Sequence, residues 1–574
     1  MFRVRRWGVA LLSVALGFTL PWNSMSVEGK GHKGVSIPRL VKSMTLEEKV
    51  GQMTMVGFYG SEPTEEIRRL IQDHHAGNVI LFAYSDNVID PEQTARLNNG
   101  LQVMAEETRL GVPLLISTDQ EGGVVARMTT GATELPGNMA LAASRVRKGA
   151  FETAALTADE LKAVGINMNL APVVDVNVNP ANPVIGVRSY GENPTLVSRF
   201  GTAAIRGYQK NGVVATAKHF PGHGDTDVDS HLGLPVIDKS REEMEQVEWR
   251  PFRQAMKAGV DAIMTAHIHV PALDDTPDLP ATLSKPILTD LLRHEMRYKG
   301  LVITDAMDMA GVVEYFGGVE EAAVKAVEAG VDIVLLTPSI STEEQAGVME
   351  AVVKAVRDGT ISEKRIDQSV TRILKVKKKY KLFRERYVDV EQVPQRVGTP
   401  EHREKAERWA RRSVTLVKND EGLLPLHLEE SDRLGIVSPF SLRELIKPYH
   451  SRVEEYRVPR LNPTDAEIDE ARKIVRDSDI LVVGTNSSHL YPQQQKLIQE
   501  LEKLDKPIVV IAFRNPYDIR DFPDVEGYLT TYGTRVVSQQ AAVETLFGIH
   551  SPTGKLPVTI PDLYPYGHGL TYGN

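Results

Sequence analysis

The stretch GVVATAKHFPGHGDTDVDSHLGLP, residues 212–235, contains the pattern that decides the fold class. Its beginning, GVVATA, is apolar or small except for one threonine, which is typical of a β-strand buried on both faces of a parallel sheet. The rest is a polar loop rich in histidine, aspartate and glycine. A buried strand followed directly by ionisable residues is the local pattern of a barrel whose active site lies at the carboxyl ends of its strands.

The same kind of apolar run occurs eight times along the chain. The runs lie at residues 53–58, 78–82, 113–118, 166–174, 212–217, 262–266, 301–304 and 332–337. Amphipathic stretches with helical spacing separate them, for example at 150–165 and 319–330. Eight buried strands that alternate with helices predict an α/β fold, a (β/α)8 barrel of the TIM type, over residues 36–385.

Ionisable residues follow five of the eight runs. They are Asp119, Asp175, Lys218 with His219, His267 and Asp305. One such residue after a strand is usually a helix cap or a solvated loop residue. Five of them at the same face of a predicted barrel indicate an active site at that face.

The loop at 218–235 contains a candidate proton donor. Asp229 and His231 are two residues apart, so an extended backbone points both side chains in the same direction. A carboxylate beside an imidazole fixes the tautomer of the ring, which suits a general acid or base. A solvated polar loop with incidental histidines is the simplest alternative.

A metal site is the second alternative for this loop. Nitrogen and oxygen ligands are available from His219, His223, Asp225, His231 and the pair His267 and His269. Barrel metallohydrolases usually carry such a histidine pair after the first strand, whereas here it follows the sixth run. The position of the pair therefore favours proton transfer, and no metal or other cofactor is predicted.

Asp305 is the candidate nucleophile. It follows the apolar run LVIT and stands at the expected carboxyl end of the seventh strand. It could instead cap the next helix, a role that aspartate often takes. Asp308 is the alternative carboxylate, but it lies within the following turn, where its side chain should point away.

Length and composition exclude several classes of protein. A chain of 574 residues is too long for one ordinary core, so two domains are expected. The formal net charge of −9 and the pI near 6.0 argue against a nucleic-acid partner. The chain has no cysteine, which excludes disulfides and thiolate chemistry.

The first 30 residues have the pattern of a secretory signal peptide. Arg3, Arg5 and Arg6 precede an apolar run at 7–20, which is shorter than a comfortable membrane-spanning helix. No convincing small-residue cleavage site follows, so an uncleaved N-terminal anchor is the alternative. No other segment is apolar enough to span a bilayer.

A second, smaller domain is predicted after the barrel. The apolar rhythm breaks at 386–400, which is the predicted linker. Beyond it, apolar runs at 413–419, 433–438, 480–486 and 507–513 alternate with helical stretches. Residues 401–574 are therefore predicted to form a layered α/β domain.

Four motifs carry a resemblance to a known family. They are TDQEGGVVARM (118–128), NPVIGVRSYG (182–191), AKHFPGHGDTDVDSH (217–231) and ITDAMDMAGV (303–312). In sequence and order they resemble glycoside hydrolase family 3, and specifically its β-N-acetylhexosaminidase branch. The resemblance continues through 411–426 and 553–570, so it implies a two-domain member with a barrel and an α/β sandwich.

The resemblance also implies a role for each matching residue. Asp305 matches the family's nucleophile, His231 the histidine acid/base of this branch, and Asp229 the partner of that histidine. The residues that hold the terminal sugar are matched by Asp119, Arg127, Arg188, Lys218 and His219. Val124 departs from the pattern, because many relatives carry arginine there.

The function implied is that of an exo-acting, retaining β-N-acetylglucosaminidase that removes terminal GlcNAc from fragments of bacterial cell wall (peptidoglycan). The protein would be secreted or associated with the cell wall. Alternatives are a family 3 β-glucosidase or xylosidase, a glycoside phosphorylase and a non-catalytic wall-binding homologue. The expected partner is a carbohydrate, with no nucleic acid and no membrane span beyond the alternative anchor.

Overall fold

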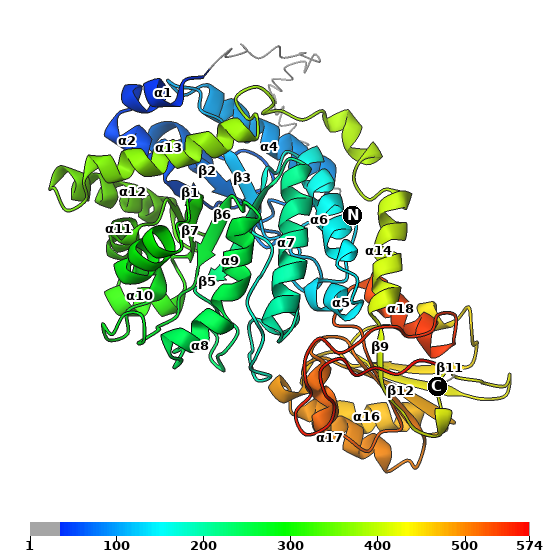
Figure 1. Cartoon of the computed structure of the whole chain (residues 1–574). Coiled ribbons are helices and arrows are strands. Elements are labelled where there is room, and N and C mark those ends of the chain that lie inside the picture. The colour runs from blue at the N-terminus through cyan, green and yellow to red at the C-terminus, as the bar shows by residue number, and fades with distance from the viewer. Residues whose placement is uncertain (1–34, 573–574) are drawn as a thin grey trace, which may run out of the picture.

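Two α/β parts follow each other along the chain (Figure 1). The computed structural model describes residues 35–572, apart from the side chain of Glu314, so the signal peptide or anchor predicted at 1–30 lies outside the described residues. The first part is a closed eight-stranded barrel, and the second contains a six-stranded sheet. The predicted fold class, a TIM-like barrel followed by a smaller α/β domain, is confirmed.

Eight parallel strands close the barrel in chain order. They are β1 (Thr54–Val56), β2 (Asn78–Ile80), β3 (Leu115–Thr118), β4 (Met168–Asn169), β5 (Val214–Phe220), β6 (Ala262–Thr265), β7 (Leu301–Ala306) and β8 (Ile333–Leu335). The last strand returns to the first, where Leu335 lies opposite Met55. Every residue of β5 is buried, as expected for a strand covered on both faces.

Helices cover the outside of the barrel. The longer ones are α4 (Pro91–Glu106), α6 (Lys148–Ala163), α7 (Pro194–Lys210), α9 (Trp249–Lys257), α11 (Val319–Ala329), α12 (Thr342–Arg357) and α13 (Glu363–Lys379). The shorter ones are α1 (Ile37–Ser43), α2 (Leu46–Gln52), α3 (Glu65–Arg68), α5 (Asn138–Ala143), α8 (Arg241–Gln246) and α10 (Ala310–Phe316). Capping boxes begin α2 and α12, where Thr45 pairs with Glu48 and Ser341 with Glu344, so the first N–H groups of these helices are satisfied.

The strands differ in length from the predicted runs, and three of the differences matter for the site. The run at 166–174 forms a strand only at β4, because Pro172 has no N–H with which to continue the ladder. In contrast, β5 and β7 extend beyond their apolar runs. Lys218, His219 and Asp305 therefore lie within strands rather than after them, which gives their side chains a fixed direction.

The second part is a mixed sheet with the strand order β11-β10-β12-β13-β14-β9. Its strands are β9 (Thr415–Asn419), β10 (Leu434–Ser438), β11 (Val453–Arg457), β12 (Ile480–Thr485), β13 (Ile508–Ala512) and β14 (Gly527–Thr530). Only β9 runs antiparallel to its neighbour. Two of the six strands, β11 and β14, were not predicted. The edge strand β11, VEEYR, is only partly buried, and β14 has four residues, so neither has a long apolar run.

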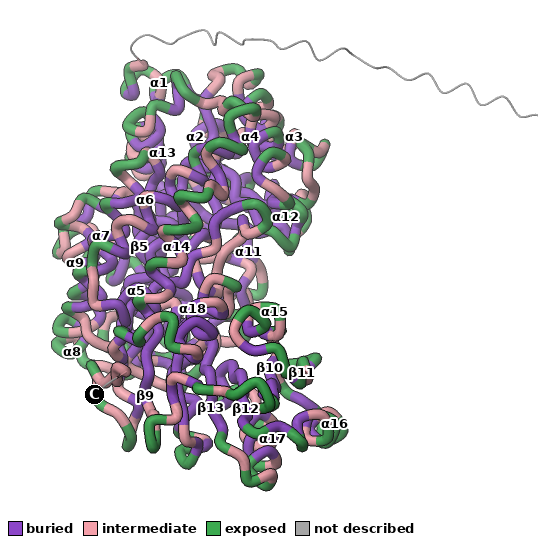
Figure 2. The backbone as a smooth tube through the Cα atoms, turned by 90° about the vertical axis from the view of Figure 1, so that its right-hand side faces the viewer, coloured by how far each residue is buried: buried purple, intermediate pink, exposed green. Residues whose placement is uncertain are grey.

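Helices pack on both faces of this sheet. On one side α16 (Asp465–Val475) and α17 (Gln493–Glu502) share a core with β12 and β13. On the other side α18 (Val536–Leu546) and α15 (Arg443–Ile446) form a second core, and α14 (Pro400–Ser413) contributes Ala410 to it. Figure 2 shows the buried backbone that runs through the interiors of both parts.

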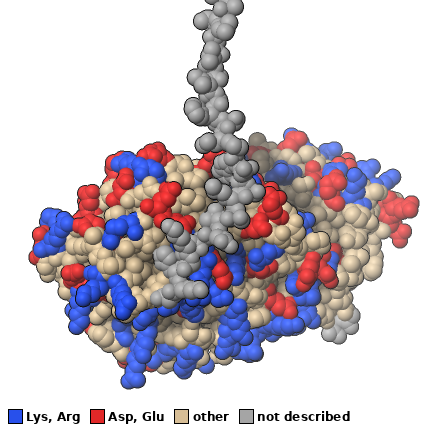
Figure 3. All heavy atoms as spheres, turned by 90° about the horizontal axis from the view of Figure 1, so that it is seen from above, with Lys and Arg blue, Asp and Glu red and all other residues tan. Residues whose placement is uncertain are grey.

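The second part docks on loops that follow β3 and β4, at the carboxyl ends of the barrel strands. Arg535 donates from Nε to the Gly123 carbonyl at 2.7 Å, and Glu192 accepts from the amide and the hydroxyl of Thr559. Val187 of the barrel belongs to the same apolar core as Tyr517 of the second part. The opposite end of the barrel, seen from above in Figure 3, carries charges of both signs.

Candidate active site

A cavity of about 340 Å³ lies at the carboxyl ends of the barrel strands. Residues at or just after seven of the eight strands line it, from Ile80 at the end of β2 to Thr337 after β8. Seven of the eight residues predicted to form the site line this cavity: Asp119, Arg127, Arg188, Lys218, His219, His231 and Asp305. The eighth, Asp229, is hydrogen-bonded to His231.

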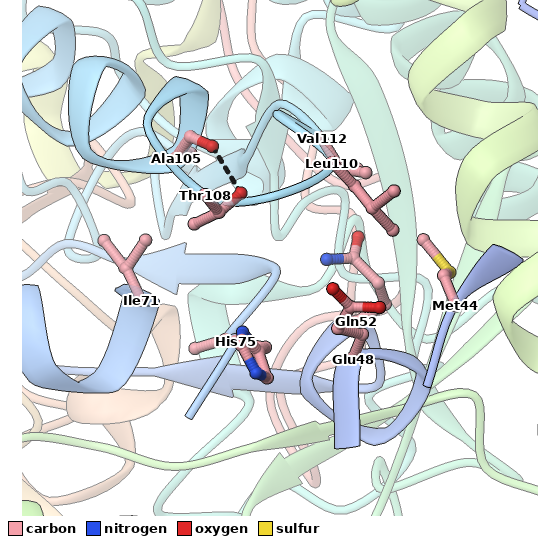
Figure 4. A pocket seen from close by; sticks show the side chains of 10 residues that line it. Met44, Glu48, Gln52, Ile71, His75, Ala105, Thr108, Leu110 and Val112 are labelled. Carbon is pink, nitrogen blue, oxygen red and sulfur yellow. Dashed lines mark hydrogen bonds between the residues drawn. The ribbon is translucent and has the colours of Figure 1, made fainter. Parts of the chain in front are cut away.

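A smaller hollow lies between α2, α4 and the loop at His75 (Figure 4). Its volume is about 20 Å³, which holds little more than one water molecule. Thr108 donates its hydroxyl to the Ala105 carbonyl across one side of it. This hollow is too small for a substrate, whereas the strand-end cavity is lined by seven of the predicted site residues and is therefore the candidate active site.

The floor of the strand-end cavity is a network of buried charges around Glu121. Lys218 Nζ lies 2.8 Å from Glu121 Oε1 and 2.7 Å from Asp119 Oδ1. Arg188 forms two hydrogen bonds to the Glu121 carboxylate, at 2.8 and 3.0 Å. Burial raises the pKa of Glu121, but Arg188 and Lys218 outweigh it and lower the pKa well below the ordinary range. Glu121 therefore keeps both cations in fixed positions.

Arg127 stands at the wall of the cavity above Phe82. Its guanidinium carbon is 5.4 Å from the centre of the Phe82 ring, and its Nη2 is 3.5 Å from Asp119 Oδ2. The buried Nε of Arg127 has no hydrogen-bond partner among residues 35–572. A buried donor without a partner is costly, so this N–H group is an unsatisfied position in the wall of the cavity.

Asp175 fixes the position of His219. The carboxylate of Asp175 lies 2.7 Å from His219 Nδ1 and also accepts the backbone N–H groups of His219 and His223. Burial raises the pKa of Asp175, but the facing histidines and amides more than compensate and lower it. The Nε2 of His219 consequently points toward Arg188, at 3.4 Å from its guanidinium.

Asp305 lies at the end of β7 in the wall of the cavity. Burial raises the pKa of its carboxyl, but His219, His267, the Ala306 amide and Lys218 together lower it. The side chain is thus held ionised, as a nucleophile requires. The Ala306 amide donates to Asp305 Oδ1 at 2.8 Å.

Asp308 also lines the cavity, although the sequence predicted that it would point away. The Thr337 hydroxyl donates to its Oδ2 at 2.6 Å, and its buried Oδ1 has no partner among the described residues. That prediction was wrong because the chain continues from β7 through a turn, which brings Asp308 back to the end of β8.

Asp229 and His231 form a pair on the exposed loop after β5. Asp229 Oδ1 lies 2.7 Å from His231 Nδ1 and accepts the His231 backbone N–H at 2.9 Å. Their side chains are 29% and 60% exposed, so the ring is accessible from the solvent side of the cavity. The Nε2 atom of His231 has no hydrogen-bond partner in the described part of the chain, and it is free to exchange a proton with a ligand.

His223, on the same loop, has a different environment. Burial lowers its pKa to about 4, and the neighbouring His219 contributes to the shift. Its Nε2 lies 2.9 Å from the Ser230 hydroxyl. The ring is therefore neutral near pH 7, which makes His223 a poor proton donor.

The histidines proposed as metal ligands do not converge on one point. The Nε2 of His267 donates to the Ala306 carbonyl at 2.9 Å, and the Nδ1 of His269 donates to the Leu279 carbonyl at 3.2 Å. Within residues 35–572 no group of three or more histidine and acidic side chains is arranged to hold a metal ion. No helix in the same residues is long and apolar enough to cross a membrane.

Sequence reasoning missed Glu121 and assigned no role to Asp175. The signal for Glu121 was its place in the motif TDQEGG, between the strand-end Asp119 and the paired glycines. Asp175 was recognised as a strand-end residue, and the structure gives it the role of orienting His219. Val124, the departure from the family pattern, packs against the apolar core of the second part.

The fold and the cavity together define a class of protein. A carboxylate held ionised, an accessible imidazole and a floor of fixed cations and carboxylates are the groups needed to bind sugar hydroxyls and to cleave a glycosidic bond. The site is that of a two-domain barrel glycoside hydrolase.

Comparison with known proteins identifies the family. The model of the glycosyl hydrolase family 3 N-terminal domain matches residues 45–376, and that of the family 3 C-terminal domain matches residues 414–572. The chain belongs to glycosyl hydrolase family 3.

Three similar proteins span nearly the whole chain. β-Hexosaminidase A from Pseudoalteromonas piscicida is 33% identical over 559 residues, which cover 86% of this chain and 91% of that protein. A β-N-acetylglucosaminidase/β-glucosidase from Cellulomonas fimi is 30% identical over 550 residues, 89% of this chain and 93% of that protein. The solved structure of a family 3 β-N-acetylglucosaminidase from Paenibacillus sp. str. FPU-7 is 38% identical, with a TM-score of 0.84, and the match covers 90% of this chain and 99% of that one.

Proposed function

We propose that this enzyme is an exo-acting, retaining β-N-acetylglucosaminidase in which Asp305 is the nucleophile and His231 the acid/base. The observation that carries the proposal is the pairing of His231 with Asp229 at the cavity that also contains Asp305. The ring has one nitrogen bound to a carboxylate and the other free. The names of the similar proteins support an N-acetylated amino sugar as the substrate.

The size of the cavity supports action at a chain end. A volume of about 340 Å³ is near the lower limit of ordinary small-molecule sites. It suits one sugar unit rather than a chain that passes through. Arg127 and Asp308 both line the cavity, so a guanidinium and a carboxylate face the substituents of that sugar.

In the first step Asp305 attacks the anomeric carbon. Its carboxylate oxygen forms the bond to this carbon while the bond to the leaving oxygen breaks. His231 gives the proton on Nε2 to that oxygen, and Asp229 holds Nδ1 so that Nε2 faces the cavity. The products of the step are a free alcohol and a glycosyl ester of Asp305.

In the second step water hydrolyses the ester. The neutral imidazole of His231 removes a proton from water, whose oxygen attacks the anomeric carbon and displaces Asp305. Two inversions give net retention of configuration. A neutral imidazole repels the ionised carboxylate of Asp305 less than a second carboxylate would. His231 and Asp305 can therefore both act near pH 7.

A panel of 4-nitrophenyl glycosides tests the proposal. We expect the β-N-acetylglucosaminide to be hydrolysed at least about tenfold faster than the β-glucoside and the β-xyloside, and NMR to show the β-anomer as the first product. Preference for the glucoside would support a β-glucosidase, and a requirement for phosphate would support a phosphorylase. Hydrolysis of none of them would support a non-catalytic homologue.

The natural substrate that we propose is a fragment of bacterial cell wall, met outside the cell. The support is the signal-like segment at the N-terminus together with the proposed sugar specificity. Incubation with purified peptidoglycan fragments should release free GlcNAc, and fractionation of the producing cells should recover the enzyme outside the membrane or bound to the wall. Release of GlcNAc from chitin oligosaccharides but not from wall fragments would indicate that chitin fragments are the natural substrate.

A further inference from the structure

A groove of about 310 Å³ on the outside of the barrel is lined by four arginines and by no acidic residue among those described. It follows α7, which packs between α6 and α9 (Figure 1). Arg199 and Arg206 come from α7 itself, Arg250 from α9, and Arg147 directly precedes α6. We call it the α7 groove. Acidic residues outnumber basic ones in the whole chain, 76 to 67, so composition alone does not account for it.

The four guanidiniums of the α7 groove have no anionic partner in the described part of the chain. Within residues 35–572 none of them takes part in an ion pair, a hydrogen bond or a ring contact. Acidic residues on neighbouring helices are held by other cations. Glu245 lies 2.8 Å from Arg253, and Glu152 lies 2.9 Å from Lys148 and 2.8 Å from Arg408. The positive charge of the groove is therefore left to an external anion.

Another cationic hollow of the barrel shows the contrasting case. Its volume is about 630 Å³, and Arg293 and Arg372 are among the residues that line it. Both arginines bind the buried carboxylate of Asp332, at 2.5 and 2.9 Å. These two guanidiniums stabilise a buried acid of the fold, whereas those of the α7 groove have no such partner among the described residues.

The charges of the α7 groove are spread along a line instead of meeting at one point. Thr195, Arg199, Thr202 and Arg206 follow each other at intervals of four, three and four residues, so they share one face of α7. From Thr195 to Arg206 the helix rises by roughly 16 Å. This length exceeds the size of one phosphate or carboxylate group, so the groove suits a chain that carries several negative charges.

The side chains of the α7 groove match the chemistry of phosphate. Arginine binds phosphate oxygens through paired N–H groups, and hydroxyl and amide side chains are the other common donors to phosphate. The groove combines its arginines with the hydroxyls of Thr195 and Thr202 and the amide of Gln254. None of the described residues that line it is aromatic, so the bases of a nucleic acid would find no ring on which to stack.

We propose that the α7 groove binds a linear polymer in which polyol or sugar units are joined by phosphodiester bonds. None of the described residues that line the groove also lines the active-site cavity, so a bound polymer leaves the cavity open. Because α7 begins at Pro194, just after Glu192 contacts Thr559 of the second part, the groove starts at the same end of the barrel as the cavity. The polymer thus holds the enzyme at an anionic surface. This inference goes beyond the proposed function and does not depend on which sugar is cleaved.

Binding of end-labelled poly(glycerol phosphate) to the whole enzyme, followed by fluorescence polarisation, tests the inference. We expect saturable binding at low salt. Arg199→Gln combined with Arg206→Gln should lower the binding constant by about tenfold or more, because two ion pairs with phosphate are lost. The slope of the logarithm of the binding constant against that of the salt concentration should become shallower by about two, one for each contact removed. The unfolding temperature should stay that of the wild type, since both arginines are exposed.

Arg96→Gln is the matched control. Arg96 is an exposed arginine on α4 without an ion pair among the described residues, it lies outside the groove, and its loss should change binding by less than about twofold. Arg147→Gln combined with Arg250→Gln should weaken binding about as much as the α7 pair, because these residues form the other walls of the groove.

Three outcomes would overturn the inference. The first is a wild-type enzyme that does not bind the polymer, and the second is an α7 double variant that binds it as the wild type does. The third is equally tight binding of polyglutamate or of single-stranded DNA with the same number of charges, which would assign the groove to carboxylates or to nucleic acid.

Discussion

The active site contains two pairs of aspartate and histidine that share a contact and differ in exposure. In both pairs Nδ1 of the ring lies 2.7 Å from a carboxylate oxygen. The side chains of His219 and Asp175 are 5% and 0% exposed, whereas those of His231 and Asp229 are 60% and 29% exposed. The same hydrogen bond therefore immobilises one ring in the floor of the cavity and leaves the other accessible at its edge.

The difference corresponds to two tasks. A nucleophile must stand at a fixed place, and Asp305 lies in a strand, among groups that keep it ionised. A proton donor must serve the leaving oxygen first and water afterwards, and His231 lies on a loop with no helix or longer strand between Phe220 and Arg241. Loops of this kind are more mobile than the strands that carry them. Residues held in strands thus define where the bond breaks, and a residue on the loop donates and accepts the protons.

The largest effect is expected at the nucleophile, which a strand holds in place beside the buried pair. Asp305→Ala should lower kcat by roughly 10⁵-fold or more, the scale seen when a covalent nucleophile is removed. A slow 2-fluoro glycoside should label the wild-type enzyme at Asp305, as mass spectrometry of the digested protein would show. Label on Asp308, the other carboxylate in the wall, would show that Asp308 is the nucleophile and that the assignment to Asp305 is wrong.

The next effect is expected at the exposed end. His231→Ala should lower kcat/KM for a natural disaccharide by about 10²–10⁴-fold, the usual contribution of general acid–base catalysis. A 4-nitrophenyl leaving group needs little protonation, so its glycosylation step should suffer less. Added azide should partly restore turnover of this activated substrate and yield a β-glycosyl azide.

His223→Ala is the control for this prediction, because His223 lies on the same loop but has a pKa lowered to about 4 by burial and a ring held by Ser230. It should show no rescue by azide. If His223→Ala is rescued and His231→Ala is close to wild type, the proton donor is the buried ring of the same loop, and the assignment to the exposed pair is wrong.

The buried ion pairs in the floor of the cavity should contribute to the stability of the folded protein. Glu121→Gln removes the negative charge between Arg188 and Lys218 and should lower the free energy of unfolding by about 3 kcal/mol, as expected when one partner of a buried ion pair is removed. Guanidinium chloride denaturation measures this loss. Glu134→Gln is the control, because Glu134 forms a looser, more exposed pair with Arg535 and accepts the Val536 N–H at 3.3 Å, a bond that glutamine can keep, so the change should cost less than about 1 kcal/mol.

The pH dependence of this loss has a definite sign. The pKa of Glu121 is lower in the folded protein than the ordinary value of about 4.3, so its charge stabilises the fold at every pH above that value. The difference between wild type and Glu121→Gln should stay constant from pH 7 to about 4.5 and shrink at lower pH, because the carboxyl of the unfolded chain takes up its proton before the folded one does. A difference that grows on acidification would contradict the network.

Glu121 also illustrates the limit of sequence analysis. Strands such as β5 and β7 were predictable because burial on both faces leaves a local apolar run, and the residues at their ends followed from the barrel topology. Glu121 lies in a glycine-rich loop, and its partner Arg188 is 67 residues away, so only the closed barrel reveals their contact. The second sheet shows the same limit, because β11 is a partly charged edge strand with no apolar run.

The exposed pair was the part of the site most visible in the sequence, since its two members are neighbours on one loop. Spacing alone predicted that Asp229 and His231 face the same way, and the structure places them in contact. Their catalytic roles rest on chemistry that neither the spacing nor the contact demonstrates. Arg127 and Arg188 were selected only through the family resemblance, because no local sequence pattern distinguishes them from the other arginines of the chain.

The smallest effect is expected from Asp229→Asn, and it tests the exposed pair most directly. The amide oxygen of asparagine can still accept the proton on His231 Nδ1, so the ring keeps its direction, but the negative charge that faces the ring is lost. Replacing a charged acceptor by a neutral one should lower kcat/KM for the disaccharide by about tenfold. Asp227→Asn, an exposed aspartate on the same loop, is the control and should stay within about twofold of the wild type. A loss as large as that of His231→Ala would mean that Asp229 itself carries the proton. A rate equal to that of the wild type would mean that Nδ1 needs no charged partner, and the likeness between the exposed pair and the buried one would then be geometric rather than functional.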